Sequence, residues 1–293
     1  MNDAAVWLEG LASKVGKFQL GPLDLMAPRG SVTALVGPNG AGKTTTLDLM
    51  MGMGRPSRGH IRILGLDQPQ DEVRIKARTA YVSPDLDFLA WGKVGRALDF
   101  VSGFYPDWDD ARCERLLDQF DLGRAERIAG LSFGARIKLS LVMAFSRDAE
   151  LLLLDEPTVG LDAAARRILF SEILGFVERE DRAVVISSHQ LADLERLADR
   201  LVVLDHGRIV LAGAMDELLQ RYVTLDATVA ADATVPAILG IRLLGRDGAR
   251  ARLLLDRNTA DPAALAACGI APVAEAPVTL DELVVALTSK AEA

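Results

Sequence analysis

The sequence predicts an α/β fold whose main sheet is parallel. Short apolar runs typical of buried strands alternate with helical patterns, and this alternation indicates βαβ units. A glycine-rich stretch at residues 37–45 lies between a predicted strand and a predicted helix. Residues 84–148 show helical patterns alone, so we expect a helical subdomain inserted into the sheet domain.

The residues before the glycine-rich stretch are predicted to form an N-terminal antiparallel β subdomain that leads into the main sheet. Turns containing glycine or proline separate its predicted strands, which are Trp7–Leu8, Phe18–Leu20, Leu23–Met26 and Val32–Val36. After the glycine-rich stretch we expect a helix at Thr45–Met51, followed by strands at His60–Leu64 and Ala80–Ser83.

The predicted helices of the inserted subdomain are Val94–Phe104, Asp110–Phe120 and Ala135–Arg147. Strands and helices then alternate again. The predicted strands are Leu151–Asp155, Ala183–Ser188, Leu201–Leu204 and Ile209–Ala212. The predicted helices are Asp162–Glu178, Leu191–Ala198 and one near Met215–Tyr222.

The composition shifts toward Ala, Val and Asp after residue 222, which indicates a second domain. We therefore expect one large domain at residues 1–222 and a small α+β domain at 223–293. A hairpin signal at Asp247-Gly248 lies between the strands Ile241–Leu244 and Arg252–Leu255. Helices are predicted at Ala263–Ala267 and Leu280–Leu287.

Composition limits the classes of function. The net charge of −8 argues against nucleic acid as the main partner, because phosphate backbones require a basic face. No apolar run reaches the length of a membrane span, and the start of the chain lacks the basic residues of a signal peptide. Cys113 and Cys268 are expected to be free thiols in a reducing compartment, so we expect a cytoplasmic protein.

The stretch Gly37-Pro38-Asn39-Gly40-Ala41-Gly42-Lys43-Thr44-Thr45 fits G-x-x-x-x-G-K-[ST], the phosphate-binding loop, in the strand–loop–helix setting that this motif requires. Its glycines let several backbone N–H groups face one anion, and the following helix presents its positive end to the same anion. Lys43 adds a charge for the outer phosphates, and the Thr44 hydroxyl is a candidate ligand for Mg²⁺. A glycine-rich turn with a solvated lysine is the alternative.

Two carboxylates, Asp155 and Glu156, follow the apolar run Leu151–Leu154. Ligands bind at the carboxyl ends of strands in open parallel sheets. Asp155 would hold Mg²⁺ directly or through water, and Glu156 would orient and deprotonate the attacking water. The alternative is an exposed acidic strand end.

Two further segments are candidates for the same site. Ser132 in Leu131–Arg136 is a plausible N-cap, which would create a second helix end able to bind an anion. An ordinary capped helix is the alternative. His189 follows a predicted buried strand and the serines Ser187 and Ser188. It is either structural or, given its position after Glu156, functional.

The order of these motifs, with Gly160-Leu161-Asp162 after the carboxylates, resembles the ATP-binding subunits of ABC transporters over residues 5–222. The resemblance implies an ATPase that uses ATP and Mg²⁺ and works as a pair, either a homodimer or a pair of close paralogues. Ser132 and Gly134 would contact the ATP of the other copy. Asp162 would communicate between the two sites, and His189 would hold the γ-phosphate.

The sequence departs from this family at three places. Phe133 and Ala135 replace Gly and Gln of the usual Leu-Ser-Gly-Gly-Gln signature, which we interpret as variation. Pro84 stands where the family has a metal-binding glutamine, and the hypothesis is that Asp85 takes part of that role. Val15 stands where an aromatic residue normally stacks on adenine. The nearest substitute is Phe18, which either stacks on the base or is a core strand residue.

The resemblance also implies partners. Separate membrane subunits would carry the transported molecule, and the ATPase would lie on the inner face of the membrane. The chain has 3 Trp, 3 Tyr and 9 Phe residues, and seven of these aromatic residues lie in the segment from Tyr81 to Trp108. Aromatic residues concentrate at interface cores. We expect Phe88 and Trp91 to line a groove for a membrane-subunit helix. Phe100 and Phe104 are expected in the subdomain core.

Two alternatives to transport are a soluble ABC ATPase, for DNA repair or for translation, and a nucleotide-binding regulator without turnover. Export is favoured over import. A soluble ABC ATPase for DNA repair would need a long coiled coil, but no heptad run occurs between Lys43 and Asp155. A translation factor of this class would need two cassettes. A nucleotide-binding regulator without turnover would not need Glu156 and His189.

Overall fold

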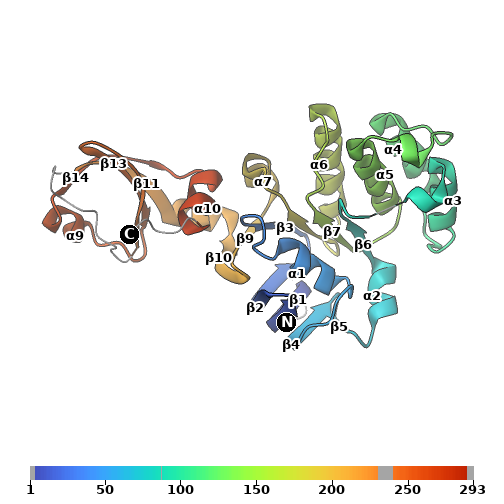
Figure 1. Cartoon of the computed structure of the whole chain (residues 1–293), viewed down its shortest axis with the longest axis horizontal. Helices are drawn as coiled ribbons and strands as arrows, with labels where there is room; N and C mark the ends of the chain where they lie inside the picture. The colour runs from blue at the N-terminus through green and yellow to red at the C-terminus, as the bar shows by residue number, and fades with distance from the viewer. Residues whose placement is uncertain (1–3, 87, 230–239, 289–293) are drawn as a thin grey trace.

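The computed structural model describes residues 4–86, 88–229 and 240–288, which form three sheets with helices packed around the middle one (Figure 1). The first sheet is antiparallel, in the order β2-β1-β4-β5. Its strands are β1 (Ala4–Val15), β2 (Phe18–Pro28), β4 (Arg58–Ile63) and β5 (Leu66–Gln68).

The second sheet has six strands in the order β10-β9-β3-β8-β7-β6. All neighbours are parallel except β10, which runs antiparallel to β9. The strands are β3 (Ser31–Val36), β6 (Thr79–Val82), β7 (Leu151–Asp155), β8 (Ala183–Ser187), β9 (Arg200–Asp205) and β10 (Arg208–Ala214).

Both faces of the second sheet are covered, as is usual for parallel sheets. Leu151 and Leu153 of β7 pack with the first sheet and with α1 (Lys43–Met50). Leu152 and Leu154 pack on the opposite face, in the core that contains α5 (Phe133–Phe145), α6 (Ala163–Val177) and α7 (Leu191–Leu197). A short helix, α2 (Glu72–Arg78), precedes β6. The carboxyl ends of β3 and β7 lead directly into the candidate site.

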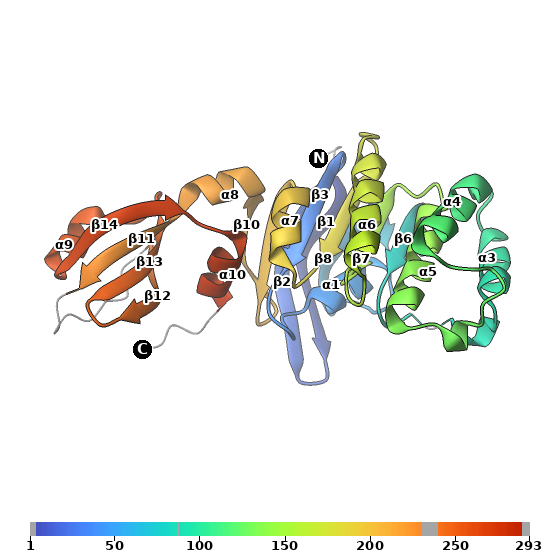
Figure 2. The same ribbon diagram turned by 90° about the horizontal axis from the view of Figure 1, so that it is seen from above.

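The helical subdomain lies beyond β6 at one end of the molecule (Figure 2). It contains α3 (Val94–Ser102), α4 (Asp110–Phe120), α5 and the 3₁₀ turns η1 (Leu89–Trp91) and η2 (Ile128–Gly130). The expectation that Phe100 and Phe104 belong to its core is wrong, because they are 45% and 64% exposed. At the surface, the Phe100 ring instead packs against Trp91 and meets the Phe104 ring edge-on.

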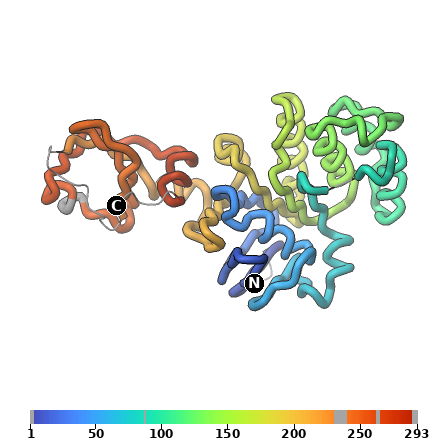
Figure 3. Tube along the Cα trace, viewed as in Figure 1, coloured from blue at the N-terminus to red at the C-terminus, as the bar shows by residue number. Residues whose placement is uncertain are grey.

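The third sheet lies at the opposite end, as the tube in Figure 3 shows. Its order is β12-β13-β11-β14, and all neighbours are antiparallel. Its strands are β11 (Tyr222–Val229), β12 (Ile241–Asp247), β13 (Arg250–Asp256) and β14 (Ile270–Pro277). The helices of this region are α8 (Met215–Arg221), α9 (Pro262–Ala267) and α10 (Leu280–Thr288).

The third sheet packs against the rest of the chain partly through α10. Leu280 and Leu283 of this helix belong to the same buried cluster as Leu194 of α7. The backbone N–H of Leu280 also donates to the Glu195 carboxylate of α7 at 3.0 Å. These contacts place α10 against the helix that follows His189.

The predicted α/β fold, with its antiparallel subdomain, helical insertion and C-terminal α+β appendage, is confirmed. Individual elements differ. The strands predicted at Phe18–Leu20 and Leu23–Met26 are one strand, β2, which runs through Gly21-Pro22. Among the described residues, no helix has both the length and the apolar character that crossing a membrane requires.

Candidate functional site

The glycine-rich loop connects β3 to α1 in a conformation that its glycines permit. Gly37 has φ 148° and Gly42 has φ 110°, both in the region that side chains disfavour. A Cβ on Gly37 would lie 2.1 Å from the carbonyl oxygen of Leu204, and one on Gly42 would lie 2.6 Å from Leu20. A side chain would collide with backbone at Gly37 and would be strained at Gly42, so both positions require glycine.

Lys43 is buried beneath this loop, with 8% of its surface exposed. Its ammonium donates hydrogen bonds to the carbonyl oxygens of Gly37 at 2.8 Å and Pro38 at 3.3 Å. The same ammonium lies 3.9 Å from Oε1 of Glu156. The positive charge is therefore held inside the loop and faces the carboxylate across the site.

Thr44 and Asp155 meet at the floor of the site. Thr44 is the second residue of α1, and Asp155 is the last residue of β7. The Thr44 hydroxyl donates to Oδ2 of Asp155 at 2.7 Å, and Asp155 is only 2% exposed. A hydroxyl beside a carboxylate is an oxygen donor set that suits Mg²⁺.

Glu156 follows β7 in a left-handed backbone conformation with φ 46°. Such conformations cost about 1–3 kcal/mol and cluster at functional sites. Its Oε2 lies 2.7 Å from Nδ1 of His189 and accepts from the backbone N–H of His189 at 3.3 Å. The structure thus places Glu156, the predicted base, between Lys43 and His189. The three residues come from three separate segments of the chain.

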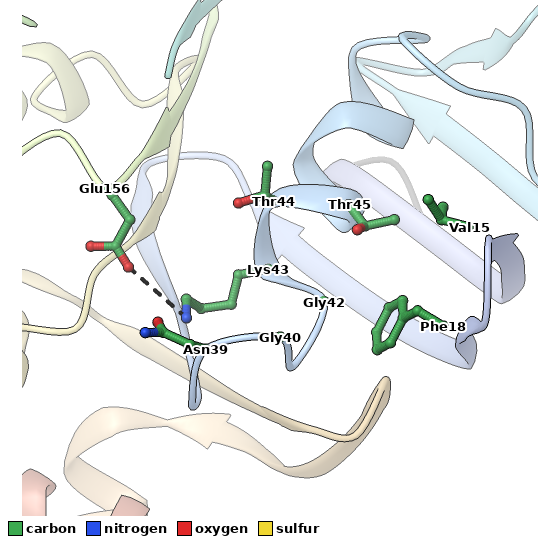
Figure 4. Close-up of a pocket in the computed structure, with 9 residues that line it drawn as sticks. All are labelled: Val15, Phe18, Asn39, Gly40, Gly42, Lys43, Thr44, Thr45 and Glu156. Atoms are coloured by element: carbon green, nitrogen blue, oxygen red, sulfur yellow. Dashed lines mark ion pairs between the residues drawn. The ribbon is translucent and has the colours of Figure 1, made fainter. Parts of the chain in front are cut away.

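A cavity of about 420 Å³ opens above the loop (Figure 4). Its lining residues are Val15, Phe18, Asn39, Gly40, Gly42, Lys43, Thr44, Thr45 and Glu156. Phe18 lies beside Gly42 at the apolar end of the cavity, and Val15 forms the rim with 57% of its surface exposed. The cavity therefore has a charged end and an apolar end.

Ser132, Gly134 and Asp162 do not line this cavity. Ser132 caps α5 by accepting a hydrogen bond from the Ala135 N–H at 3.1 Å, so the predicted N-cap is confirmed. A Cβ on Gly134 would lie 2.1 Å from the carbonyl oxygen of Gly160, so the two backbones are in contact. These residues form a second cluster, in which Ser132 and Asp162 are exposed and Gly134 is buried.

Asp162 caps α6 within that second cluster. Its carboxylate accepts from the backbone N–H of Ala165 at 2.8 Å and lies 3.3 Å from the Lys138 ammonium. The hydrogen bond from Ala165 is the main reason that the pKa of Asp162 is lowered, and Lys138 adds to it. Asp162 therefore stays ionised at the start of the helix.

Asp85 lies just beyond β6 and is exposed. Its charge acts on Asp48, which lies one turn after Thr44 on α1 and accepts a hydrogen bond from the Tyr81 hydroxyl at 2.9 Å. Burial raises the pKa of Asp48, the Tyr81 bond opposes this, and the charges of Asp155 and Asp85 raise it further. Asp85 thus lies within electrostatic reach of residues beside Asp155, although it does not line the cavity.

Two further residues, neither of them assigned a role from the sequence, connect the segments around Asp155, Glu156 and His189. Ser187, at the end of β8, bonds both carboxylate-bearing residues at the strand end. Arg166 of α6 donates to the Gln190 side chain at 3.0 Å and pairs with Asp193 of α7. The one available signal was the position of Ser187 two residues before His189. Nothing in the sequence near Arg166 marked it.

A family model described as ABC transporter matches residues 20–159. The Nod factor export ATP-binding protein I of Paraburkholderia xenovorans is 31% identical over 77% of this chain and 76% of that protein. A daunorubicin resistance ATP-binding protein of Streptomyces coeruleorubidus is 32% identical over 74% of this chain and 71% of its own length.

Solved structures agree on the fold. The structure of an ATP-binding subunit of an ABC transporter superposes with a TM-score of 0.68 at 27% identity. The superposed region covers 74% of this chain and 92% of the ATP-binding subunit. A nucleotide-free ATP-binding cassette of an ABC transporter has a TM-score of 0.61 at 18% identity, over 74% of this chain and 94% of its own.

Proposed function

The chain belongs to the ATP-binding proteins of ABC transporters, and on this premise we propose that it hydrolyses Mg·ATP in the cavity between Lys43 and Glu156 to drive export. Membership makes it an ATPase subunit of a transporter complex with membrane subunits. The residue roles, the metal, the pairing of two copies and the direction of transport are the parts that we propose.

The observation that carries the proposal is the position of Glu156 between Lys43 and His189. The backbone N–H groups of residues 37–45 and the Lys43 ammonium would hold the phosphates, since a helix N-terminus and a curled backbone both favour anions. Glu156 would accept a proton from the attacking water, and His189 would contact the γ-phosphate. Phe18 would contact the base at the apolar end of the cavity.

Thr44 and Asp155 are the residues that would hold Mg²⁺, with Asp85 assisting. Their oxygens form a hard donor set, and the Thr44–Asp155 distance of 2.7 Å already brings hydroxyl and carboxylate together. When bound, Mg²⁺ would neutralise charge that develops on the phosphates. Asp155 and Thr44 would keep the phosphate end of ATP in place for Glu156.

The second cluster supports a paired arrangement. Ser132 is exposed at the N-terminus of α5, and it does not line the cavity of its own chain. We propose that Ser132 and Gly134 contact the ATP bound by a second copy or a close paralogue. Asp162, which lies at the start of α6, would carry the state of one site to the other.

The exposed aromatic residues Phe100 and Phe104, together with Trp91 and Phe88, mark where a membrane subunit would bind. Trp91 and Phe100 also line a second cavity of about 280 Å³. We propose that a short helix of the membrane subunit binds over it, with the ATPase on the inner face of the membrane. Export is favoured because the relatives named above are an export protein and a drug-resistance protein. The net charge of −8 gives no support for a nucleic-acid partner.

The test is Mg²⁺-dependent ATP hydrolysis by the purified chain. Replacing Glu156→Gln should lower turnover about 10²–10⁴-fold while ATP binding persists, because general-base catalysis has that magnitude. Glu178→Gln, an exposed residue at the end of α6, is the matched control. Full turnover in Glu156→Gln would refute the assigned base.

The partner surface is tested separately, by co-purification with the membrane subunit. Phe88→Ala combined with Trp91→Ala should abolish assembly. Val73→Ala, 83% exposed on α2, should leave assembly unchanged. Undiminished assembly of the double variant would remove the proposed groove.

A further inference from the structure

Ser187 is a buried polar residue at the point where the two carboxylates of the site meet. It is the last residue of β8, and no part of its surface is exposed. In the parallel register of β7 and β8, Ser187 lies opposite Asp155. Strand pairing therefore brings its hydroxyl beside the end of β7.

The Ser187 hydroxyl makes two hydrogen bonds at this point. It donates to Oδ1 of Asp155 at 2.5 Å and accepts from the backbone N–H of Glu156 at 3.0 Å. A serine hydroxyl has one proton to donate and lone pairs to accept, so it can make both bonds at once. A bond from a hydroxyl to a carboxylate is of the stronger, charge-assisted kind.

The two bonds act on different properties of the site. The bond to Oδ1 fixes the rotation of the Asp155 carboxylate, so that Oδ2 is directed to the Thr44 hydroxyl. The Glu156 N–H is held by the Ser187 hydroxyl and also by the Ser187 carbonyl oxygen at 3.2 Å. These contacts hold Glu156 in its left-handed backbone conformation, with φ 46°. Residues in that conformation persist only when their surroundings hold them there.

A continuous series of hydrogen bonds results, from Thr44 through Asp155, Ser187 and Glu156 to His189. Ser187 is the member that joins the proposed metal-binding half to the proposed water-activating half. Its own side chain does not line the cavity. It can therefore act on the reaction only by orienting Asp155 and Glu156.

We propose that Ser187 is a positioning residue for ATP hydrolysis, which sets the Asp155 carboxylate and the Glu156 backbone in one mutual arrangement. This inference rests on the proposed roles of Asp155 and Glu156. Removing the hydroxyl frees the Asp155 carboxylate to rotate and leaves the Glu156 N–H with one acceptor. Nucleotide binding through residues 37–45 does not depend on either bond.

The experiment compares Ser187→Ala with Ser146→Ala in the full chain. Ser146 is equally buried and donates to the carbonyl oxygen of Val142 at the end of α5, away from the site. Both changes remove one fully buried hydroxyl, and Ser187→Ala, which loses two bonds including one to a carboxylate, should lower thermal stability somewhat more. Only Ser187→Ala should act on the reaction and on the metal.

Three quantities are measured. Turnover at saturating Mg·ATP should fall about 10- to 100-fold in Ser187→Ala, the usual effect of losing a residue that orients a ligand. Binding of ATP without metal should stay within twofold of the unchanged protein. Mn²⁺ titrated into the protein with a non-hydrolysable ATP analogue, followed by electron paramagnetic resonance, should bind about tenfold more weakly.

Turnover within threefold of the unchanged protein, or an equal loss in Ser146→Ala, would overturn the role of Ser187. Unaltered Mn²⁺ affinity would overturn its action on Asp155. Glu156→Gln in the same assay distinguishes a failure of this inference from a failure of the proposed role of Glu156 as the base. If Glu156→Gln kept its turnover, the proposed base would be wrong. If Glu156→Gln lost turnover and Ser187→Ala did not, only the role of Ser187 would be refuted.

Discussion

The ammonium of Lys43 lies 3.9 Å from the carboxylate of Glu156, across the charged end of the cavity. In the proposed site the first group would attract the outer phosphates of ATP and the second would repel them. Because Glu156 is 17% exposed and Lys43 is 8% exposed, solvent screens neither charge fully. The two groups would therefore act in opposite directions on the affinity for ATP.

Glu156→Gln should tighten ATP binding. It removes a negative charge that faces the phosphates, and two unit charges about 4 Å apart interact by ~1 kcal/mol even in water, about fivefold in affinity. Fluorescent ATP-analogue titration in low salt measures this change. Lys43→Met, which removes the attractive charge, should weaken binding in the same titration. Equal affinity in both variants would contradict the proposed placement of the phosphates.

Phe18→Leu should weaken binding of ATP but not of inorganic tripolyphosphate. A base stacked on an aromatic side chain gains about 1–3 kcal/mol, which corresponds to at least about a fivefold change in affinity. Tripolyphosphate has no base, so its competition with ATP at Lys43 serves as the internal control. If both ligands weaken equally, Phe18 supports the glycine-rich loop and does not contact the base.

Asp85→Ala should raise the Mg²⁺ concentration needed for half-maximal ATP hydrolysis severalfold. The reason is that the charge of Asp85 reaches Asp48 beside Asp155. Steady-state hydrolysis over a Mg²⁺ series measures the shift. Glu9→Ala, an exposed carboxylate on β1, is the control. An unchanged Mg²⁺ dependence with full activity would end the hypothesis that Asp85 replaces the family's glutamine.

Glu172→Gln should destabilise the protein at neutral pH and much less in acid. Burial would raise the pKa of Glu172, but hydrogen bonds from Arg115 and Arg112 of α4 hold it below its ordinary value of 4.5. Because the pKa of Glu172 is lower in the folded than in the unfolded protein, its carboxylate stabilises the fold at pH values above 4.5. This stabilisation is lost as the pH falls through the lowered pKa of the folded protein. We expect a loss of about 1–3 kcal/mol at pH 7, typical of hydrogen bonds to charged groups.

Thermal unfolding of Glu172→Gln and the unchanged protein between pH 7 and pH 3 checks this sign. The difference should shrink below pH 4.5. Glu180→Gln, an exposed residue before β8, should show no such trend. A constant difference across the range would assign the effect to packing.

Leu283→Ala should destabilise the ATP-binding part of the chain as well as the appendage. Leu283 is fully buried in the cluster that includes Leu194 of α7, and such truncations cost about 2–5 kcal/mol. Val273→Ala, 66% exposed on β14, is the control. Calorimetry with and without ATP should show one transition shifted downward. Two separated transitions would mean that the appendage unfolds independently.

Much of the fold could be predicted because the sequence marks it locally. Leu151–Asp155 and Asp110–Phe120 have the bounds predicted for them, since an apolar run and a capped amphipathic helix are both local patterns. The strand β14 was missed because Ile270–Pro277 is rich in Ala and Pro and does not alternate. The helix α2 was missed because only Ile75 of its seven residues is buried.

The site residues that lie in sequence motifs could be predicted. The contacts that depend on how the strands pair could not. Lys43, Asp155 and Glu156 lie in recognisable patterns. The bonds of Ser187 depend on its register opposite Asp155, which no local pattern reveals. Phe100 and Phe104 were assigned to the core from their spacing alone. The helix α3 ends at Ser102, so Phe104 lies in the turn after it, and α3 directs Phe100 outward, toward Trp91 and the second cavity.

The contact between Gly134 and Gly160 has a mechanical consequence. No side chain separates the two backbones, so there is no soft layer to absorb movement between the first turn of α5 and the turn that precedes Asp162. The start of α5 and the turn before α6 are therefore in direct backbone contact. A displacement imposed on Ser132 from outside the chain would press on the turn that carries Asp162, within the same subunit.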